Sequence, residues 1–445
     1  MKNNYVQPTP DALMGMVKAS GLKEKAIFTL LAIAVFRFLA QVPLFGIDNA
    51  IFSQLAAGNN LIAFIDLFSG GALGKVSIIA LGIGPYITAS IVMQLMAVIV
   101  PKWEQMQKEE GEAGRRKLSQ YSRLLTVFIA MFQGGVFLSY LTHQAPMAIL
   151  PGISKGLFFV GSMLILTAGA VFVMWLSELI TERGIGNGGS LLIFAGILAG
   201  IPVYATKTGQ LIANDAGMQM NLVLLLGIFA ATMVLIVIMQ EAIRKVIIVN
   251  PKRQVGNKIY GGMNTHIPFK LNPGGVMPII FAVAILYFPA TVLQFLGQAF
   301  RGKSLETVFE HLTQVLSPTG FTYYAIYFGL IVLLTFFYAS IMPNMQPKDI
   351  ANNLKKHGSS IPGVKPGRPT AEALDRILSR TTFIGAMALG VIALIPSLAS
   401  KVTNITTFQG IGATSLIIMV GVALDLINQV KTHLLAKQYE SFLKE

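Results

Sequence analysis

The chain has 445 residues, of which 54% are hydrophobic and only 12% are charged. Soluble proteins carry about 25% charged residues, so this composition excludes an ordinary water-soluble domain and favours a protein that crosses a membrane several times. The formal net charge is +14 and there is no cysteine, which excludes a disulfide framework and thiolate metal sites.

Ten apolar stretches are long enough to cross a membrane, since a spanning helix needs about 20 predominantly apolar residues. Between the first two, Leu61–Ser69 is apolar apart from Asp66 but is only about half long enough to cross. We expect it to be a re-entrant or interfacial helix beside a cavity. The ten spans are expected at residues 26–44, 76–100, 124–141, 157–179, 188–205, 221–239, 276–296, 323–342, 381–399 and 412–427.

Lysine and arginine are distributed unevenly over the loops that these spans create. Of the 34 basic residues, 27 fall on the side that carries both termini and 5 on the other. Positively charged loops stay in the cytoplasm, so we expect both termini there. This topology also explains most of the net charge without a nucleic-acid partner.

The spans divide into two groups of five. Because five is odd, a duplicated second half would be inverted relative to the first. The second span of each half carries the pattern G-x-x-P-x-I, at 82–87 and 275–280, and such paired interruptions point to a functional centre. The alternative is that Gly and Pro are simply common in membrane helices. We expect an N-terminal half over 1–206, a C-terminal half over 207–428 and a cytoplasmic tail over 429–445.

Motifs typical of chemistry are absent from the sequence. The G-x-G-x-x-G match at 184–189 lies between two apolar spans instead of after a strand, and no acidic residue follows at the required distance. We therefore expect a tight turn there, no cofactor, no metal and no catalytic residue. Arg37 is the one clear charge well inside a span, and we expect it to bind a carbonyl or carboxylate or to extend to the cytoplasmic face.

Two long basic segments lie on the predicted cytoplasmic side. Residues 244–270, within a loop of about 241–275, contain two extended runs around the turn-like Gly256 and Asn257, which predicts a protruding hairpin. A second long loop covers 343–380. Basic tips suit an acidic soluble partner or structural RNA, and contact with anionic lipid headgroups is the alternative.

Several blocks of sequence carry a resemblance to a known family. The chain resembles the SecY family of protein-conducting channels, bacterial or plastid type, from about Leu22 to Ser441. The blocks are Phe68–Leu73 (FSGGAL), Ala80–Ser90 (ALGIGPYITAS), Glu110–Arg123 (EGEAGRRKLSQYSR), Ile180–Gly188 (ITERGIGNG), and Asn353–Lys356 with Pro362–Gly367.

The resemblance implies an all-α polytopic membrane protein, with ten transmembrane helices in two inverted five-helix halves around a central pore. A constriction ring would consist of Ile83, Ile87, Ile193, Ile280 and Ile418, with Gly189 in place of the usual sixth aliphatic residue. A short plug of about 61–74 would include Phe64, Leu67, Phe68, Gly70 and Gly71. The second and seventh spans would form a lateral gate with Gln94, Gln133, Asn272, Pro85 and Pro278.

The same resemblance implies partners and a location. The partners would be SecE-like and SecG-like small membrane subunits, a SecA-type motor ATPase, the ribosome, and preproteins with their signal sequences, beside anionic lipids. The membrane would be a bacterial plasma membrane or a thylakoid-type membrane. Lys365 stands where the family usually has Arg and lacks the planar fork of that side chain. Partner binding would involve Arg115, Arg116, Lys252, Arg253, Lys258, Lys355, Lys356, Lys365 and Arg368.

We therefore predict a passive channel that passes unfolded polypeptides across the membrane and releases apolar segments sideways into lipid, driven by a motor or ribosome. The alternative is an inverted-repeat secondary transporter of a small solute. The scarcity of ionisable groups at mid-membrane disfavours that alternative, because ion-coupled transport depends on such groups. A membrane-embedded enzyme and a scaffold that only docks ribosomes are more distant alternatives.

Overall fold

The computed structural model places each of the ten predicted spans on a helix. These helices are α2 (Leu22–Leu39), α5 (Gly84–Ile99), α7 (Gly111–Gln144), α8 (Lys155–Arg183), α9 (Gly188–Asn214), α10 (Met218–Glu241), α11 (Met277–Ala299), α13 (Phe321–Ile341), α15 (Arg368–Thr403) and α16 (Ala413–Phe442). Shorter helices are α6 (Pro101–Lys108), η1 (Pro146–Ala148), α12 (Glu306–Val315) and α14 (Pro347–Lys356). The structure describes residues 21–52, 66, 69–108, 111–144, 146–152, 154–214, 218–255, 258–261, 264–299, 306–316, 320–341, 346–403 and 413–442.

Seven of the described helices are long and apolar enough to cross a membrane by themselves, namely α7, α8, α9, α10, α13, α15 and α16. The other three predicted spans lie on α2, α5 and α11. Helix α5 has 16 residues, which at 1.5 Å per residue reach about 24 Å against a hydrocarbon core of about 30 Å. The rest of the crossing at α5 must therefore be made by non-helical chain. Such chain is tolerated inside a membrane only where it is buried in protein or lines a cavity, so a cavity is expected there.

The expected helix over 76–100 is wrong in its first third. Helix α5 begins at Gly84 because Gly82 adopts a left-handed φ of 55° and Pro85 occupies the first turn, where it is tolerated. The preceding turns instead pair with residues that follow α2: the N–H of Leu44 donates to the carbonyl of Val76 at 2.8 Å. For the same reason α2 ends at Leu39 rather than at residue 44.

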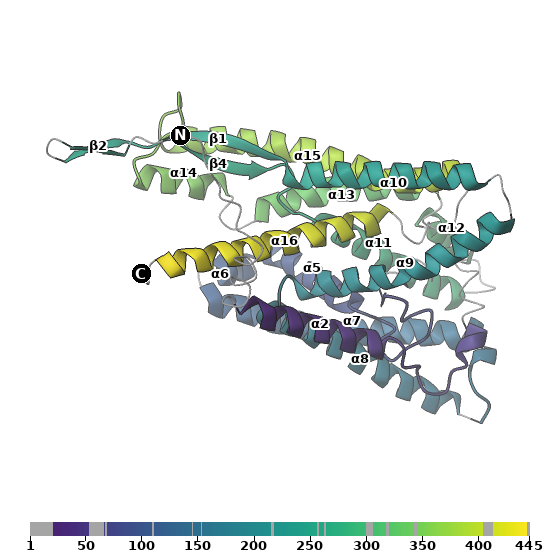
Figure 1. The fold of residues 1–445 in the computed structure, drawn as a ribbon. Helices are drawn as coiled ribbons and strands as arrows, with labels where there is room; N and C mark the ends of the chain where they lie inside the picture. Colours follow the sequence, from purple (N-terminus) through teal and green to yellow (C-terminus); the bar gives the residue numbers. More distant parts are fainter. Residues whose placement is uncertain are drawn as a thin grey trace. The chain divides into compact units, whose positions relative to one another are not determined.

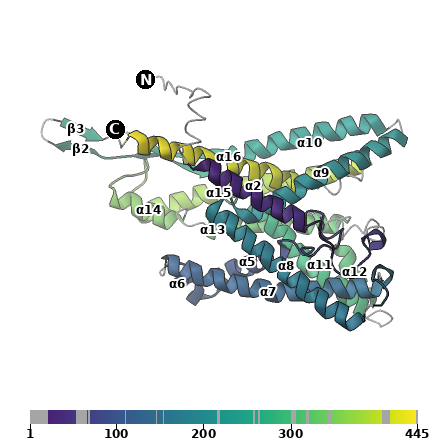
Figure 2. The same cartoon turned by 60° about the horizontal axis from the view of Figure 1, so that its bottom comes forward.

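The chain divides into two compact units. Unit 1 comprises residues 1–207, 291–310 and 422–445, and unit 2 comprises 208–290 and 311–421. Within unit 1, α7 packs against both α5 and α8, and α2 packs on α8 (Figure 2). Within unit 2, α10 and α13 both pack against α15 (Figure 1). The assignment of residues 1–206, 207–428 and 429–445 to two inverted halves and a tail stays a prediction.

The predicted basic hairpin is confirmed. Strand β1 (Ile243–Val249) pairs antiparallel with β4 (Asn264–Lys270), and β2 (Lys252–Val255) pairs with β3 (Lys258–Gly261). The register joins Val255 to Lys258, so two residues connect these strands. The β2–β3 end extends beyond the helices of its unit (Figures 1 and 2).

The second long loop contains regular structure that the sequence analysis did not predict. It holds α14 and the first turns of α15, which begins at Arg368 and runs for 36 residues. The expected span over 381–399 is therefore the inner part of a longer helix. Its charged first turns escaped prediction because the span was identified by apolar residues alone.

Candidate functional site

The described end of the predicted plug is a turn organised by one carboxylate. The Oδ1 atom of Asp66 accepts hydrogen bonds from the Ser69 hydroxyl at 2.9 Å and from the N–H of Gly74 at 2.8 Å. The Ser69 hydroxyl in turn accepts from the N–H of Leu73 at 3.0 Å. Burial raises the pKa of the Asp66 carboxyl, and these hydrogen bonds oppose that shift. The turn is thus held by polar groups of its own.

Arg37 of α2 binds this turn. Its Nη1 donates a hydrogen bond to the carbonyl oxygen of Gly70, so it binds a carbonyl as one of the two alternatives expected. Gly70 has a φ of +70°, and a Cβ atom there would lie 2.8 Å from the Cα of Gly196 and 2.9 Å from Nη1 of Arg37. The absence of a side chain therefore permits both the left-handed conformation and the close approach to α9.

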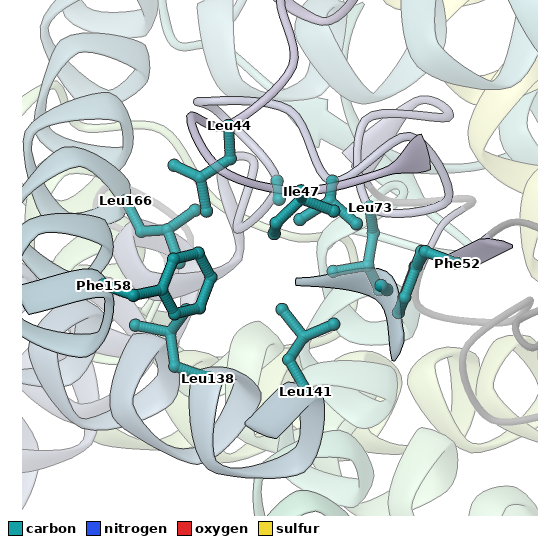
Figure 3. Packing of buried hydrophobic residues seen from close by; sticks show 11 residues of the cluster. Leu44, Ile47, Phe52, Leu73, Leu138, Leu141, Phe158 and Leu166 are labelled. Carbon is teal, nitrogen blue, oxygen red and sulfur yellow. The ribbon is translucent and has the colours of Figure 1, made fainter. Parts of the chain in front are cut away.

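An apolar cluster supports the chain on either side of this turn (Figure 3). It joins residues from the 44–52 segment and from 73–80 to the facing sides of α7 and α8. The members shown and labelled in Figure 3 are Leu44, Ile47, Phe52, Leu73, Leu138, Leu141, Phe158 and Leu166. Close packing of this kind fixes the position of a segment that has little regular structure.

Three of the predicted ring residues lie in unit 1. Ile83 and Ile193 are 2% and 1% exposed, and Ile87 is half-buried. A Cβ atom added to Gly189 would lie 3.5 Å from Cδ1 of Ile83. The Ile83 side chain therefore lies directly over the position where the sequence lacks its sixth aliphatic residue. In unit 2, Ile280 and Ile418 are buried.

Two of the predicted gate residues keep an unsatisfied polar atom. Gln133 of α7 is 6% exposed, and its Nε2 has no hydrogen-bond partner among the described residues. Asn272 donates from Nδ2 to the carbonyl of Gly275 at 2.7 Å, whereas its Oδ1 has no partner within the described part of the chain. Buried polar atoms without partners are costly, so they mark positions that a second state or a ligand can satisfy.

The remaining gate and plug residues are placed as follows. Gln94 is half-buried on α5, Pro85 is buried in the first turn of α5, and Pro278 is buried near the start of α11. Gly71 lies in the turn beside Gly70. Three plug residues lie outside the described part of the chain: Phe64, Leu67 and Phe68.

A small apolar core unites the hairpin with the second basic loop, and we call this assembly the hairpin platform: β1, β4, α14, residues 357–367 and the first turns of α15. Val246 and Phe269 of the two strands pack against Leu374 and Leu378 of α15. Strand β1 is also hydrogen-bonded to the 357–367 segment. The N–H of Val249 donates to the carbonyl oxygen of Ser360 at 2.9 Å, and the N–H of Ser360 donates to the carbonyl oxygen of Val249 at 3.1 Å. The platform therefore holds its surface charges in fixed relative positions.

Five of the nine basic residues predicted to bind partners have described side chains, and all five are exposed. Lys355, Lys356, Lys365 and Arg368 are exposed on the hairpin platform. Arg368 pairs with Glu372 at 2.9 Å. Arg116 is exposed on α7 of unit 1, where Glu112 lies 3.9 Å away. Side-chain positions of Arg115, Lys252, Arg253 and Lys258 lie outside what the structure describes, although their backbones form α7, β2 and β3.

One ion pair joins two helices of unit 1 and was not predicted from the sequence. Nε of Arg123 on α7 lies 3.0 Å from Oε1 of Glu178 on α8, and Glu178 is largely buried. The two residues are 55 positions apart, so neither spacing nor periodicity indicated the pair.

Among the described residues there is no group of three or more His, Asp or Glu that could hold a metal ion.

Comparison with known proteins gives consistent matches. The sequence pattern of the SecY family matches residues 77–427. The chain is 44% identical to the protein translocase subunit SecY of Synechococcus elongatus, over 98% of each chain. It is 39% identical to the protein of the same name from Aquifex aeolicus, over 97% of this chain and 99% of that one.

Solved structures share the fold. A structure described as a protein conducting channel superposes with a TM-score of 0.67 at 17% identity, covering 93% of this chain and 92% of that chain. A structure on the SecY plug domain gives 0.65 at 17% identity with the same coverage. The Sec61 channel of the canine ribosome-channel complex gives 0.63 at 16% identity, again over 93% and 92%. The family match and the named relatives favour the predicted channel over the solute transporter and over an enzyme.

Proposed function

Since this chain belongs to the SecY family of protein translocase subunits, we propose how its residues conduct a polypeptide. The chain is a multi-pass integral membrane protein and the subunit of a protein-conducting channel, not an enzyme. The likeness to a translocase subunit over 98% of the chain carries this conclusion. The proposal assigns the conduit, its seal, its exit into lipid and its docking surface to particular residues.

The proposed conduit is sealed by Ile83, Ile87, Ile193, Ile280 and Ile418. Aliphatic side chains make no directional bonds, so such a ring can close around any translocating side chain, and it excludes water and ions when empty. Gly189 removes one member of the ring. The Ile83 side chain over Gly189 supports the proposal, because it supplies apolar surface at that position.

The proposed plug is residues 61–74. The turn at Asp66 and the apolar cluster of unit 1 hold its described end, residues 69–74. One of the matched structures concerns a SecY plug that stabilises the closed channel and maintains a membrane seal. In this chain the same role would fall to a short segment with too few apolar residues to cross the membrane. Its release is required before a polypeptide can pass.

The proposed lateral gate lies between the second and seventh spans, with Gln94, Gln133, Asn272, Pro85 and Pro278 as its residues. The unsatisfied Nε2 of Gln133 and Oδ1 of Asn272 support this assignment, because a donor and an acceptor are each left available. An apolar segment can leave through such a gate: each Leu or Ile gains about 0.3–0.6 kcal/mol at the bilayer centre, whereas one Asp or Lys costs about 2.5–3.5 kcal/mol. This difference separates membrane segments from secreted ones.

The hairpin platform is the proposed docking surface for a ribosome or a SecA-type motor ATPase. Its fixed and exposed lysines and arginines suit structural RNA or an acidic protein surface, and a matched Sec61 structure is a ribosome-channel complex. This assignment places both termini in the cytoplasm, in a bacterial plasma membrane or thylakoid-type membrane. SecE-like and SecG-like subunits would complete the channel, and anionic lipids would bind the remaining basic loops.

Removal of two ring side chains tests the proposed seal. Replacement of Ile87 and Ile280 by Gly should make the resting channel conduct small ions in planar bilayers, because the apolar constriction loses two side chains. The matched control replaces Ile238 and Ile384 by Gly; these residues are 60% and 58% exposed on α10 and α15. Equal conductance of the two double variants would refute the ring assignment.

A further inference from the structure

The contact between Arg37 and Gly70 suggests a role for a charge that a passive channel does not otherwise need. A charged side chain within a membrane helix is costly and is retained where it has a specific partner. Arg37 donates to the backbone of a segment 33 residues away. A carbonyl acceptor, unlike a side chain, fixes the main chain of that segment directly.

The bonded carbonyl belongs to Gly70, which lies close to two helices. Gly70 packs on Gly196 of α9, and Arg37 approaches it from α2. The guanidinium therefore joins α2, α9 and the turn at a single point, where hydrogen bonds to charged groups are among the stronger ones.

We propose that Arg37 is a positioning residue that latches the plug in the closed channel through the Gly70 carbonyl. This inference rests on the assignment of residues 61–74 as the plug. Opening then requires the loss of this strong hydrogen bond and the withdrawal of Leu73 from the apolar cluster of unit 1.

The test measures exposure of the plug in the full channel complex in membranes. Because the chain has no cysteine, a single cysteine at Leu73, and separately at Ala72, can report accessibility to a membrane-impermeant maleimide. Arg37→Gln should raise the labelling rate about tenfold or more, since hydrogen bonds to charged groups are worth about that factor. Lys23→Gln removes an exposed charge from the same helix and should leave the rate unchanged. Arg37→Lys, which keeps one charged donor, should fall between them.

A pair of glycine variants tests the same contact without a change in charge. Gly70→Ala should displace Arg37 and raise labelling, because its Cβ collides with Gly196 and Nη1. Gly71→Ala measures backbone strain alone, since Gly71 also has a positive φ, of +84°, but faces open space. The double variant of Arg37→Gln and Gly70→Ala should label no faster than the faster single variant, because both break one contact.

Two results would overturn the latch: labelling of Arg37→Gln at the wild-type rate, or equal labelling of Gly70→Ala and Gly71→Ala. If Arg37→Gln is lost from the membrane, the glycine pair decides the question. Labelling does not depend on conduction, so a failure of the latch is distinguishable from a failure of the channel assignment. Ion leak through Arg37→Gln in planar bilayers, with intact Ile83 and Ile87, provides the functional counterpart.

Discussion

The turn at residues 66–74 and the hairpin platform fix their positions by opposite means. The turn uses a few buried polar contacts, in which Asp66 binds Ser69 and Gly74 and Arg37 binds Gly70. The platform uses a small apolar core around Phe269 and leaves its charges on the surface. Buried polar contacts are costly to break and surface charges are cheap to remove. The comparison therefore separates a region built to hold or release a segment from one built to receive a partner.

The largest effect on stability is expected in the apolar core of the hairpin platform. Phe269→Ala should destabilise the hairpin by about 3–5 kcal/mol, because the side chain is 1% exposed and its removal leaves a cavity. Limited proteolysis of the hairpin should accelerate accordingly. Ile247→Ala, on the exposed side of β1 at 56% exposure, is the matched control. Equal proteolysis of the two variants would show that the core does not hold the platform.

A smaller effect is expected in the turn. Asp66→Asn should weaken it by about 1.5–3 kcal/mol, because a neutral amide accepts more weakly from Ser69 and Gly74 than a carboxylate does. Hydrogen exchange at the Gly74 amide should lose protection by the corresponding factor. Glu112→Gln, at a carboxylate exposed on α7, should leave that amide unchanged. Unaltered protection in Asp66→Asn would mean that the carboxylate does not organise the turn.

The smallest effect on stability is expected at the platform surface. Arg368→Gln breaks an exposed ion pair with Glu372 and should cost about 0.3–0.5 kcal/mol. It should nevertheless weaken ribosome or motor ATPase binding, most clearly at low salt. Glu372→Gln breaks the same pair and keeps the positive charge, so it should retain binding. A parallel loss of binding in both variants would indicate a structural role for the ion pair.

The sequence predicted those features that follow from local patterns. Hydrophobic length located the helices, and two extended runs around Gly256 and Asn257 predicted the hairpin. The start of α5 was missed because a turn at Gly82 is as apolar as a helix and looks continuous in hydropathy. The partner of Arg37 and the Arg123–Glu178 pair were out of reach, because each joins residues distant in sequence and no periodicity records such contacts.

The candidate site shows the same limit. The resemblance supplied the ring positions and, with them, Gly189 as the missing member. That the Ile83 side chain lies over Gly189 is a contact between residues distant in sequence, which no local pattern records. The unsatisfied atoms of Gln133 and Asn272 are likewise visible only after folding.

The central claim is that Ile87 lines the path of a translocating chain. A photocrosslinker attached to a single cysteine at Ile87, in this cysteine-free chain, can be challenged with a secretory polypeptide stalled in membranes. Crosslinks are expected from Ile87 and none from Val92, which is exposed on the same helix. Translocation that proceeds without any crosslink at Ile87 would contradict the assigned conduit.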